Sequence, residues 1–329
     1  MGILLILALS FVPMAIYALF LWWLDRYEKE PLPLLAAAFI WGAIPSIILA
    51  LIMQVVLDIP IVAFSPNPLM YDLLGASVVA PLTEEGVKAL AVLALLLLVR
   101  HEIDSPIDGV IYGGVVGFGF AAVENVFYLA GAYTEEGAGA AVALGFMRAV
   151  VFGLNHAMFT GFTGLGVALS LEVRNKALKP LIILLGFAVA VGAHAFHNAF
   201  STFWSYTENG GSLLVALIAD WAGVLILLLV ALWAYFLERK RITAYAELLV
   251  KDQKLPQSDV AILKSTRQRH IARLQTLFAG DTQRWWAMQR YHRKLTEAAF
   301  AWHRVRGGDN GALERFQRLE REALALRQA

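Results

Sequence analysis

Seven long apolar runs dominate this sequence and limit it to a fold that crosses a membrane. Each run has about 20 or more mostly apolar residues, the length a helix needs to span the hydrocarbon core of a bilayer. The runs cover residues 2–24, 33–57, 70–99, 107–131, 139–172, 180–204 and 212–237. Unpaired backbone groups cannot face lipid, and no run alternates in the manner of a strand. The runs therefore predict an all-α fold with about seven transmembrane helices.

The composition of the 329-residue chain agrees with this fold class. The chain is 59% hydrophobic and only 16% charged, whereas about 25% of the residues in soluble proteins are charged. It has no cysteine, which excludes disulfides, thiolate nucleophiles and thiolate metal sites. The first run lacks the positive charges that open a secretory signal and extends to Leu24. We therefore expect it to be retained as a transmembrane helix.

The positive charges between the runs predict which way the helices cross the membrane. Between the runs, lysine and arginine occur only in alternate loops, around residues 26–29, 100, 174–179 and 239–241. The other loops, 58–69, 132–138 and 205–211, contain neither. Short loops that are rich in lysine and arginine stay in the cytoplasm. With seven spans, the N-terminus is then extracytoplasmic and the C-terminal tail is cytoplasmic.

The chain divides into two parts of opposite charge. Residues 1–237 carry a net charge of −8, and residues 238–329 carry +9. We predict a transmembrane core in the first part and a basic cytoplasmic domain of three or four amphipathic helices in the second. The Trp285-Trp286 pair indicates either contact with anionic lipid headgroups or a solvated domain with tryptophans in its core. No nucleic-acid-binding module is recognisable, so no nucleic-acid partner is expected.

Ionisable side chains lie inside four of the apolar runs, where burial is costly unless they are paired or hydrated. They are Glu84, Glu85 and Lys88 in the third run, Glu124 in the fourth, Arg148 and His156 in the fifth, and His194 and His197 in the sixth. Glu85, Glu124, His156 and His194 each lie 15 or 16 residues from the cytoplasmic end of their run. This is a depth of roughly 22–24 Å. Side chains from four helices at one depth predict a single site in the outer half of the bilayer.

Carboxylates and histidines together can hold a divalent metal ion such as Zn²⁺. A bound ion acidifies water, and a nearby carboxylate can accept the proton as the water attacks a carbonyl carbon. Such groups could hydrolyse a peptide bond inside a membrane. Glu84 and Glu85 lie about 100° apart on a helix, so one faces the site while the other pairs with Lys88. The sequence leaves open which of the two is which.

These side chains also have structural interpretations. Glu84, Glu85 and Lys88 could neutralise one another, and Glu124 or either histidine could be a hydrogen bond between helices. His197 lies one turn from the shared depth, so we assign it to support or packing. Arg148 lies about 12 Å outward of His156 and is expected to reach the outer interface. Glycines in the fourth and fifth runs predict close helix packing. A purely structural interpretation leaves the shared depth without a cause.

Four short motifs occur in order on successive runs. Residues 84–88 read EEGVK, residues 120–125 read FAAVEN, residues 156–160 read HAMFT and residues 194–198 read HAFHN. They match EExxK, FxxxEN, a histidine-led motif and HxxxN of the PrsW family of intramembrane proteases. That family is related to the CAAX prenyl endopeptidases and the bacteriocin-processing enzymes. The resemblance covers residues 80–204 and does not extend to the first two runs or the tail.

The resemblance implies a membrane-embedded, metal-dependent endopeptidase that cleaves membrane-anchored substrates near the extracytoplasmic face, such as anti-sigma factors. It implies that Glu84 activates the water, with Glu85 as its competitor for this role. It also implies that Asn198 stabilises the oxyanion and that Lys88, Asn125 and His197 support the site. The metal, expected to be zinc, would be held by Glu124, His156 and His194.

Two functions from other classes remain as alternatives. Buried carboxylates and imidazoles also relay protons in ion-coupled transporters. Transporters, however, favour inverted repeats and broken spans, and the sequence shows no sign of either. A scaffold that holds partners through its basic tail would function without the intramembrane carboxylates.

Overall fold

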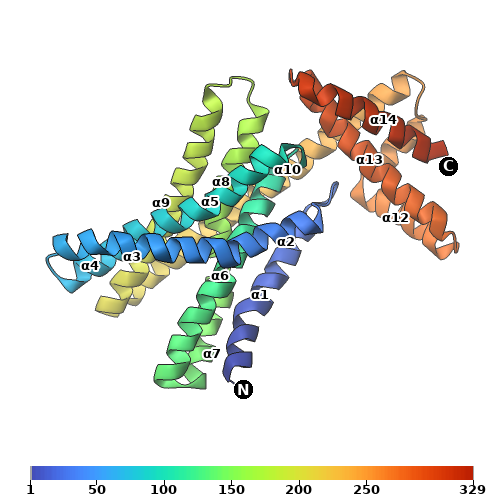
Figure 1. Ribbon diagram of the computed structural model, residues 1–329. Coiled ribbons are helices and arrows are strands. Elements are labelled where there is room, and N and C mark those ends of the chain that lie inside the picture. The colour runs from blue at the N-terminus through green and yellow to red at the C-terminus, as the bar shows by residue number, and fades with distance from the viewer. Residues whose placement is uncertain (1, 329) are drawn as a thin grey trace. The chain divides into compact units, whose positions relative to one another are not determined.

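The computed structural model describes residues 2–328, and every secondary-structure element in that range is a helix (Figure 1). This confirms the predicted all-α class. The α-helices are α1 (Gly2–Leu24), α2 (Leu32–Trp41), α3 (Ile47–Phe64), α4 (Pro68–Leu74), α5 (Ala80–Leu98), α6 (Pro106–Glu136), α7 (Ala138–Phe146), α8 (Asn155–Glu172), α9 (Leu178–Thr207), α10 (Gly210–Lys251), α11 (Gln257–Leu263), α12 (Thr266–Phe278), α13 (Thr282–Arg306) and α14 (Leu313–Gln328). Three π-helical turns, Gly42–Ser46, Gly75–Val79 and Met147–Val151, continue α2, α4 and α7.

Six stretches of the described chain are long and apolar enough to cross a membrane. They are Gly2–Leu24, Leu32–Ala63, Pro106–Glu136, Ala138–Glu172, Leu178–Thr207 and Gly210–Lys251. The chain is therefore a multi-pass helical membrane protein. The predicted third run, 70–99, is also helical, as α4, a π-turn and α5. It is not one of the six because it contains three charged residues close together, Glu84, Glu85 and Lys88. The total of seven spans and their orientation stay predictions.

Helix α6 is the most enclosed of the six spans and packs against α1, α2 and α8. Its glycines explain how close the α8 backbone comes. A Cβ atom at Gly113 would lie 2.4 Å from the carbonyl oxygen of Thr160, and one at Gly117 would lie 2.2 Å from that of His156. Only glycine fits such contacts, as expected where small residues pack helices in lipid. This packing holds the start of α8 against the middle of α6.

The fifth predicted run is interrupted at the start of α8. The π-turn Met147–Val151 follows α7, residues 152–154 form a turn, and α8 begins at Asn155. This corrects the expectation that no span is broken. Non-helical backbone is tolerated at membrane depth where it borders a cavity, and Phe152 and Gly153 line the cavity described below. The break therefore lies directly before His156.

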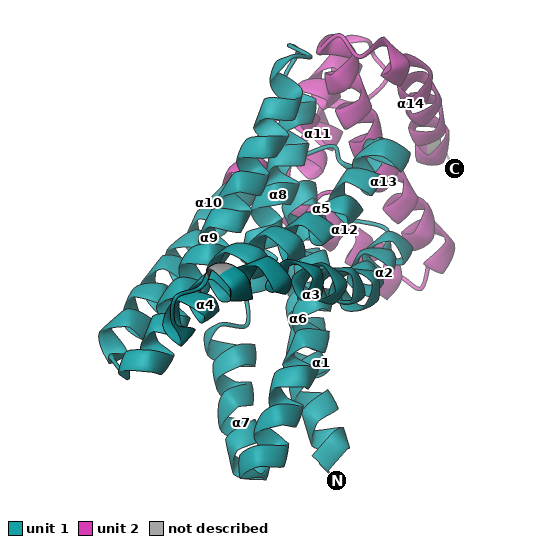
Figure 2. Cartoon of the chain, turned by 60° about the vertical axis from the view of Figure 1, so that its left-hand side comes forward, with its two compact units in different colours: residues 1–24, 30–231 teal, residues 25–29, 232–329 magenta. Residues whose placement is uncertain are grey.

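The chain forms two compact units, which divide within α10 between residues 231 and 232 (Figure 2). The second unit contains residues 232–329 together with the short segment 25–29. Helices α10, α11, α13 and α14 of this unit enclose an apolar core that includes Leu263 and Leu295. Tyr27 belongs to that core, where its hydroxyl donates to the carbonyl oxygen of Lys264 over 2.8 Å.

The two adjacent tryptophans of the second unit lie outside its core. Trp286 is 58% exposed, and Trp285 is only partly buried. The interpretation of this pair as core residues is therefore wrong for Trp286. Contact with lipid headgroups stays a prediction.

Candidate active site

A cavity of about 650 Å³ lies within the first unit. Helices α3, α5, α6, α8 and α9 all contribute to its wall. Its polar lining consists of Gln54, Glu84, Glu124, Asn125, Arg148, Asn155, His156, His194, His197, Asn198, Ser201, Thr202 and Ser205. Most of the site residues expected from the sequence are in this set, while Glu85 and Lys88 lie behind it. The structure thus brings the predicted residues of four helices together around one space.

The rotation of α5 separates the two adjacent glutamates. Glu84 lines the cavity, and Gln54 of α3 donates a hydrogen bond to its Oε1 over 3.2 Å. Its Oε2 is buried and has no hydrogen-bond partner within residues 2–328. Glu85 is fully buried and accepts hydrogen bonds from Lys88 over 2.7 Å and from Thr160 over 2.9 Å. Glu84 is therefore the glutamate of the pair that reaches the cavity.

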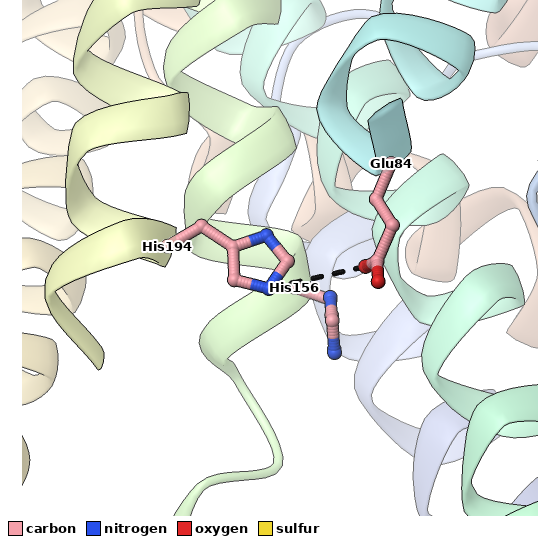
Figure 3. Close-up of side chains that lie close together, drawn as sticks. All are labelled: Glu84, His156 and His194. Carbon is pink, nitrogen blue, oxygen red and sulfur yellow. Dashed lines mark ion pairs between the residues drawn. The ribbon is translucent and has the colours of Figure 1, made fainter. Parts of the chain in front are cut away.

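His194 lies between the two glutamates. Its Nδ1 is 3.0 Å from Oε1 of Glu85, and its Nε2 is 3.8 Å from Oε2 of Glu84 (Figure 3). The ring stacks on Phe159, with 4.7 Å between the ring centroids. When Nδ1–H donates to the Glu85 carboxylate, the lone pair of Nε2 faces the cavity carboxylate. Metal-binding histidines are commonly oriented in this way, by a carboxylate that accepts a hydrogen bond from the ring nitrogen that does not bind the metal.

His156, the second residue of α8, has polar neighbours on both ring nitrogens. Nδ1 lies 3.2 Å from Nζ of Lys88, and Nε2 lies 2.9 Å from Oε2 of Glu124. Lys88 is fully buried and also lies over the Phe120 ring. Because an ammonium can only donate, Nδ1 accepts from Lys88 and Nε2–H donates to Glu124.

Arg148 lies in the site instead of reaching the outer interface as expected. Its guanidinium donates to Glu124 through Nη2 and to Asn125 over 2.8 Å through Nε. It also lies over the Tyr128 ring, 3.8 Å from the centroid. The depth estimate assumed a continuous helix, whereas a π-turn and a break separate Arg148 from His156. Glu124 therefore has an arginine as well as a histidine partner.

Three of these residues could share a metal ion. Glu84, His156 and His194 each offer one ligand atom, and the three atoms lie within 4.8 Å of one another (Figure 3). Two imidazoles and a carboxylate form a donor set used by catalytic zinc sites. Oε2 of Glu84 lies 3.6 Å from Nζ of Lys88 but has no hydrogen-bond partner within residues 2–328. This oxygen and the orientation of His194 by Glu85 fit such an ion. If His156 bound the ion, the ring nitrogen that binds it would give up its present hydrogen bond, either to Lys88 or to Glu124.

Two other predicted residues lie on α9 at the cavity wall. Asn198 donates a hydrogen bond from its side-chain amide to the carbonyl oxygen of Ala76 over 2.7 Å. An amide has two N–H groups, so one is left for another acceptor. Nδ1 of His197 lies 2.7 Å from Oδ2 of Asp220.

The sequence reasoning missed two polar residues of this region. Gln54 of α3 bonds to Glu84, but it is uncharged and did not stand out in its apolar run. Asp220 of α10 is a lone carboxylate in the seventh run and is 3% exposed. The rule that singled out the other ionisable residues in apolar runs would have found it.

Comparison with known proteins finds a matching family model. Residues 30–236, more than half of the chain, match the model of the PrsW family, described as PrsW family intramembrane metalloprotease. The match includes every residue of the cavity described above. It also reaches beyond the 80–204 range of the sequence motifs.

Two curated relatives are similar to part of the chain. Protease PrsW of Clostridioides difficile (strain 630) is 33% identical over 151 residues, which are 46% of this chain and 60% of the relative. Protease PrsW of Geobacillus kaustophilus (strain HTA426) is 32% identical over 140 residues, 43% of this chain and 55% of the relative. The chain thus spans less than two thirds of the length of these relatives. No solved structure matches it.

Proposed function

Because this chain belongs to the PrsW family of intramembrane metalloproteases, we propose that it hydrolyses peptide bonds of membrane-anchored proteins in the cavity of its first unit. The observation that carries the proposal is the convergence of Glu84, His156 and His194 on that cavity. A cavity of about 650 Å³ is within the range of small-ligand sites. It has room for a short unwound stretch of a substrate and not for a whole helix.

We assign the metal to Glu84, His156 and His194, with zinc as the ion that best suits these donors. When bound, the ion would acidify a water molecule and polarise the carbonyl group to be attacked. Glu85 orients His194, and Lys88 balances the charge of Glu85. This assignment differs from the ligand set expected from the motifs, in which Glu124 takes the place of Glu84.

Glu124 is the proton acceptor in this assignment. It lines the cavity and forms an ion pair with Arg148. A carboxylate in hydrogen-bonding reach of water can take its proton as the oxygen attacks the carbonyl carbon. The free N–H of the Asn198 amide would then donate to the oxygen that becomes negative.

Metal analysis and a cleavage assay on the same purified variants test the proposal. We expect Glu84→Gln to lose both stoichiometric zinc and cleavage of a single-pass reporter protein, and Glu124→Gln to keep zinc but lose cleavage. The motif-based assignment expects the reverse pattern for zinc. Asp58→Asn is a matched control, because Asp58 is hydrogen-bonded to Tyr71 and lies outside the cavity. Full cleavage by both glutamine variants would refute a protease site in this cavity.

The substrate and the side of cleavage are further parts of the proposal. The predicted topology puts the site in the outer half of the bilayer, so the cut would fall near the extracytoplasmic end of a substrate helix. A membrane-anchored anti-sigma factor is a substrate of suitable form. Mass spectrometry of the reporter fragments would locate the cut, and a cut at the cytoplasmic end would contradict this placement.

An ion-coupled transporter is the second candidate because the span that carries His156 is broken beside a polar cavity. Broken helices at mid-membrane depth are typical of transporters. Protein reconstituted into vesicles with a pH gradient would distinguish the two functions. Proton flux that is lost in Glu124→Gln, without cleavage of any reporter, would favour the transporter.

A further inference from the structure

A second polar cluster lies at the wall of the same cavity, and of its three residues only His197 belongs to a sequence motif. Asp220 of α10 is 3% exposed, and its Oδ2 lies 2.7 Å from Nδ1 of His197 on α9. The same oxygen accepts a hydrogen bond from the Asn155 amide of α8 over 2.9 Å. His197 and Asn155 both line the cavity. Three helices thus contribute one residue each to this cluster.

The charge that the cluster can carry depends on the partners of Asp220. A buried carboxylate in an apolar span needs a positive partner. Within the described chain, the ion pairs of Asp220 include His197 but no lysine or arginine. Within the described chain His197 is therefore the side chain that can supply this positive charge, and a pair of imidazolium and carboxylate has no net charge. Such a pair can deliver a proton and take one back.

The geometry directs that proton toward the cavity. Nδ1 of His197 lies 2.7 Å from Oδ2 of Asp220 and 3.1 Å from the amide nitrogen of Asn155. Nε2 is therefore the nitrogen left to exchange protons with other groups. The His197 side chain is 17% exposed, and Phe152 packs edge-on against its ring at 5.1 Å between centroids. The same orientation of a histidine by a buried aspartate serves proton transfer in hydrolases.

We propose that His197 is the proton donor to the departing amine and that Asp220 is the residue that positions it. This inference rests on the proposed function, because a departing amine exists only if a peptide bond is cleaved. Glu124 accepts one proton of the water while the water oxygen bonds to the carbonyl carbon. As the carbon–nitrogen bond breaks, the Nε2 proton of His197 moves to the amine nitrogen. The proton on Glu124 then returns to His197 through cavity water, which restores both groups.

The cluster could instead only tie α8, α9 and α10 together. The leaving group distinguishes the two roles. An amine needs a proton in order to leave, whereas an alcohol with a low pKa leaves from an ester with little help. A donor of protons therefore matters for an amide and much less for an ester. A structural clamp matters equally for both.

The probes are a synthetic single-span peptide that the wild-type protein cleaves and its analogue with an activated ester at the cleaved bond. For Asp220→Asn and His197→Gln, we expect amide cleavage to fall by about 100-fold or more and ester cleavage to change by less than about threefold. Asp58→Asn, which removes a carboxylate of the same unit outside the cavity, should leave both rates unchanged.

An equal loss for the amide and the ester would show a structural clamp and overturn the proposal, as would unchanged amide cleavage. Failure of the proposed function looks different. In that case the wild-type protein cleaves no single-span peptide, or Glu84→Gln cleaves both probes at the wild-type rate. Either result would refute the proposed protease function and, with it, the role of His197 as proton donor.

Discussion

Oε1 of Glu85 lies 3.0 Å from Nδ1 of His194, while the neighbouring Glu84 lies 3.8 Å from Nε2 of the same ring. Two adjacent residues of one helix therefore reach opposite nitrogens of a single histidine. Glu85 is fully buried with Lys88, and Glu84 lines the cavity. Glu85 thus lies on the buried side of His194, and Glu84 lies on the side that faces the cavity.

This relationship predicts that Glu85→Gln weakens metal binding without abolishing it. The amide can still contact His194, but it no longer provides the charge that strengthens the ligand. Loss of such an orienting partner typically costs 10–100-fold in metal affinity. Competition with a fluorescent zinc chelator would measure this. Glu84→Gln serves as the comparison, and equal zinc affinity in Glu85→Gln and the wild type would contradict the orienting role.

Arg148 and Glu124 should be energetically coupled. Removing either one leaves the other charged at the cavity wall without its main partner, so each single change is expected to lower the melting temperature. The double variant Arg148→Gln/Glu124→Gln should be more stable than the two single effects predict, with a coupling energy of about 0.5–3 kcal/mol. Thermal unfolding of the four proteins in one detergent measures it. Additive effects would show that the contact contributes nothing to stability.

A methyl group added to α6 should disturb the site only where α6 meets α8. In Gly113→Ala, the new Cβ would lie 2.4 Å from the carbonyl oxygen of Thr160, whose hydroxyl bonds to Glu85. The helices must then separate, which we expect to cost about 1–3 kcal/mol of unfolding free energy. Gly131→Ala is the matched control on the same helix, because no atom lies within 4 Å of its added Cβ. Equal melting temperatures of the two variants would show that the helices do not meet as described.

The sequence predicted the helical class and the gathering of Glu84, Glu85, Glu124, His156 and His194. It did so because charge in an apolar helix is conspicuous and residue count measures depth. It could not choose between Glu84 and Glu85, since that choice depends on the rotation of α5 against its neighbours.

Arg148 was placed wrongly for a related reason. A constant rise per residue holds only in an unbroken helix, and hydropathy alone does not show the turn at 152–154. A partner such as Asp220 becomes meaningful only when tertiary packing brings His197 to it.

The second unit should lose stability in mild acid because it buries a neutral histidine. His292 of α13 is 6% exposed, and its Nδ1 has no hydrogen-bond partner within residues 2–328. Burial and, to a smaller extent, the positive charges of Arg269 and Arg273 together lower the pKa of His292 to about 3. Between that pKa and the ordinary value near 6.5, the unfolded chain binds a proton that the folded chain does not. The free energy of unfolding therefore falls as the pH decreases through this range, by up to roughly 1.4 kcal/mol per pH unit.

Hydrogen–deuterium exchange of α13 in the intact protein, corrected for the intrinsic effect of pH on exchange, would measure this loss. Protection of α13 should decline from pH 6.5 to pH 4.5 in the wild type. In His292→Phe it should decline much less, because no proton is then taken up at this position on unfolding. His270→Ala, a change at an exposed histidine of α12, should behave as the wild type does. The same decline in His292→Phe as in the wild type would assign the acid sensitivity to other groups, since phenylalanine preserves the burial of the ring and removes only its ability to bind a proton.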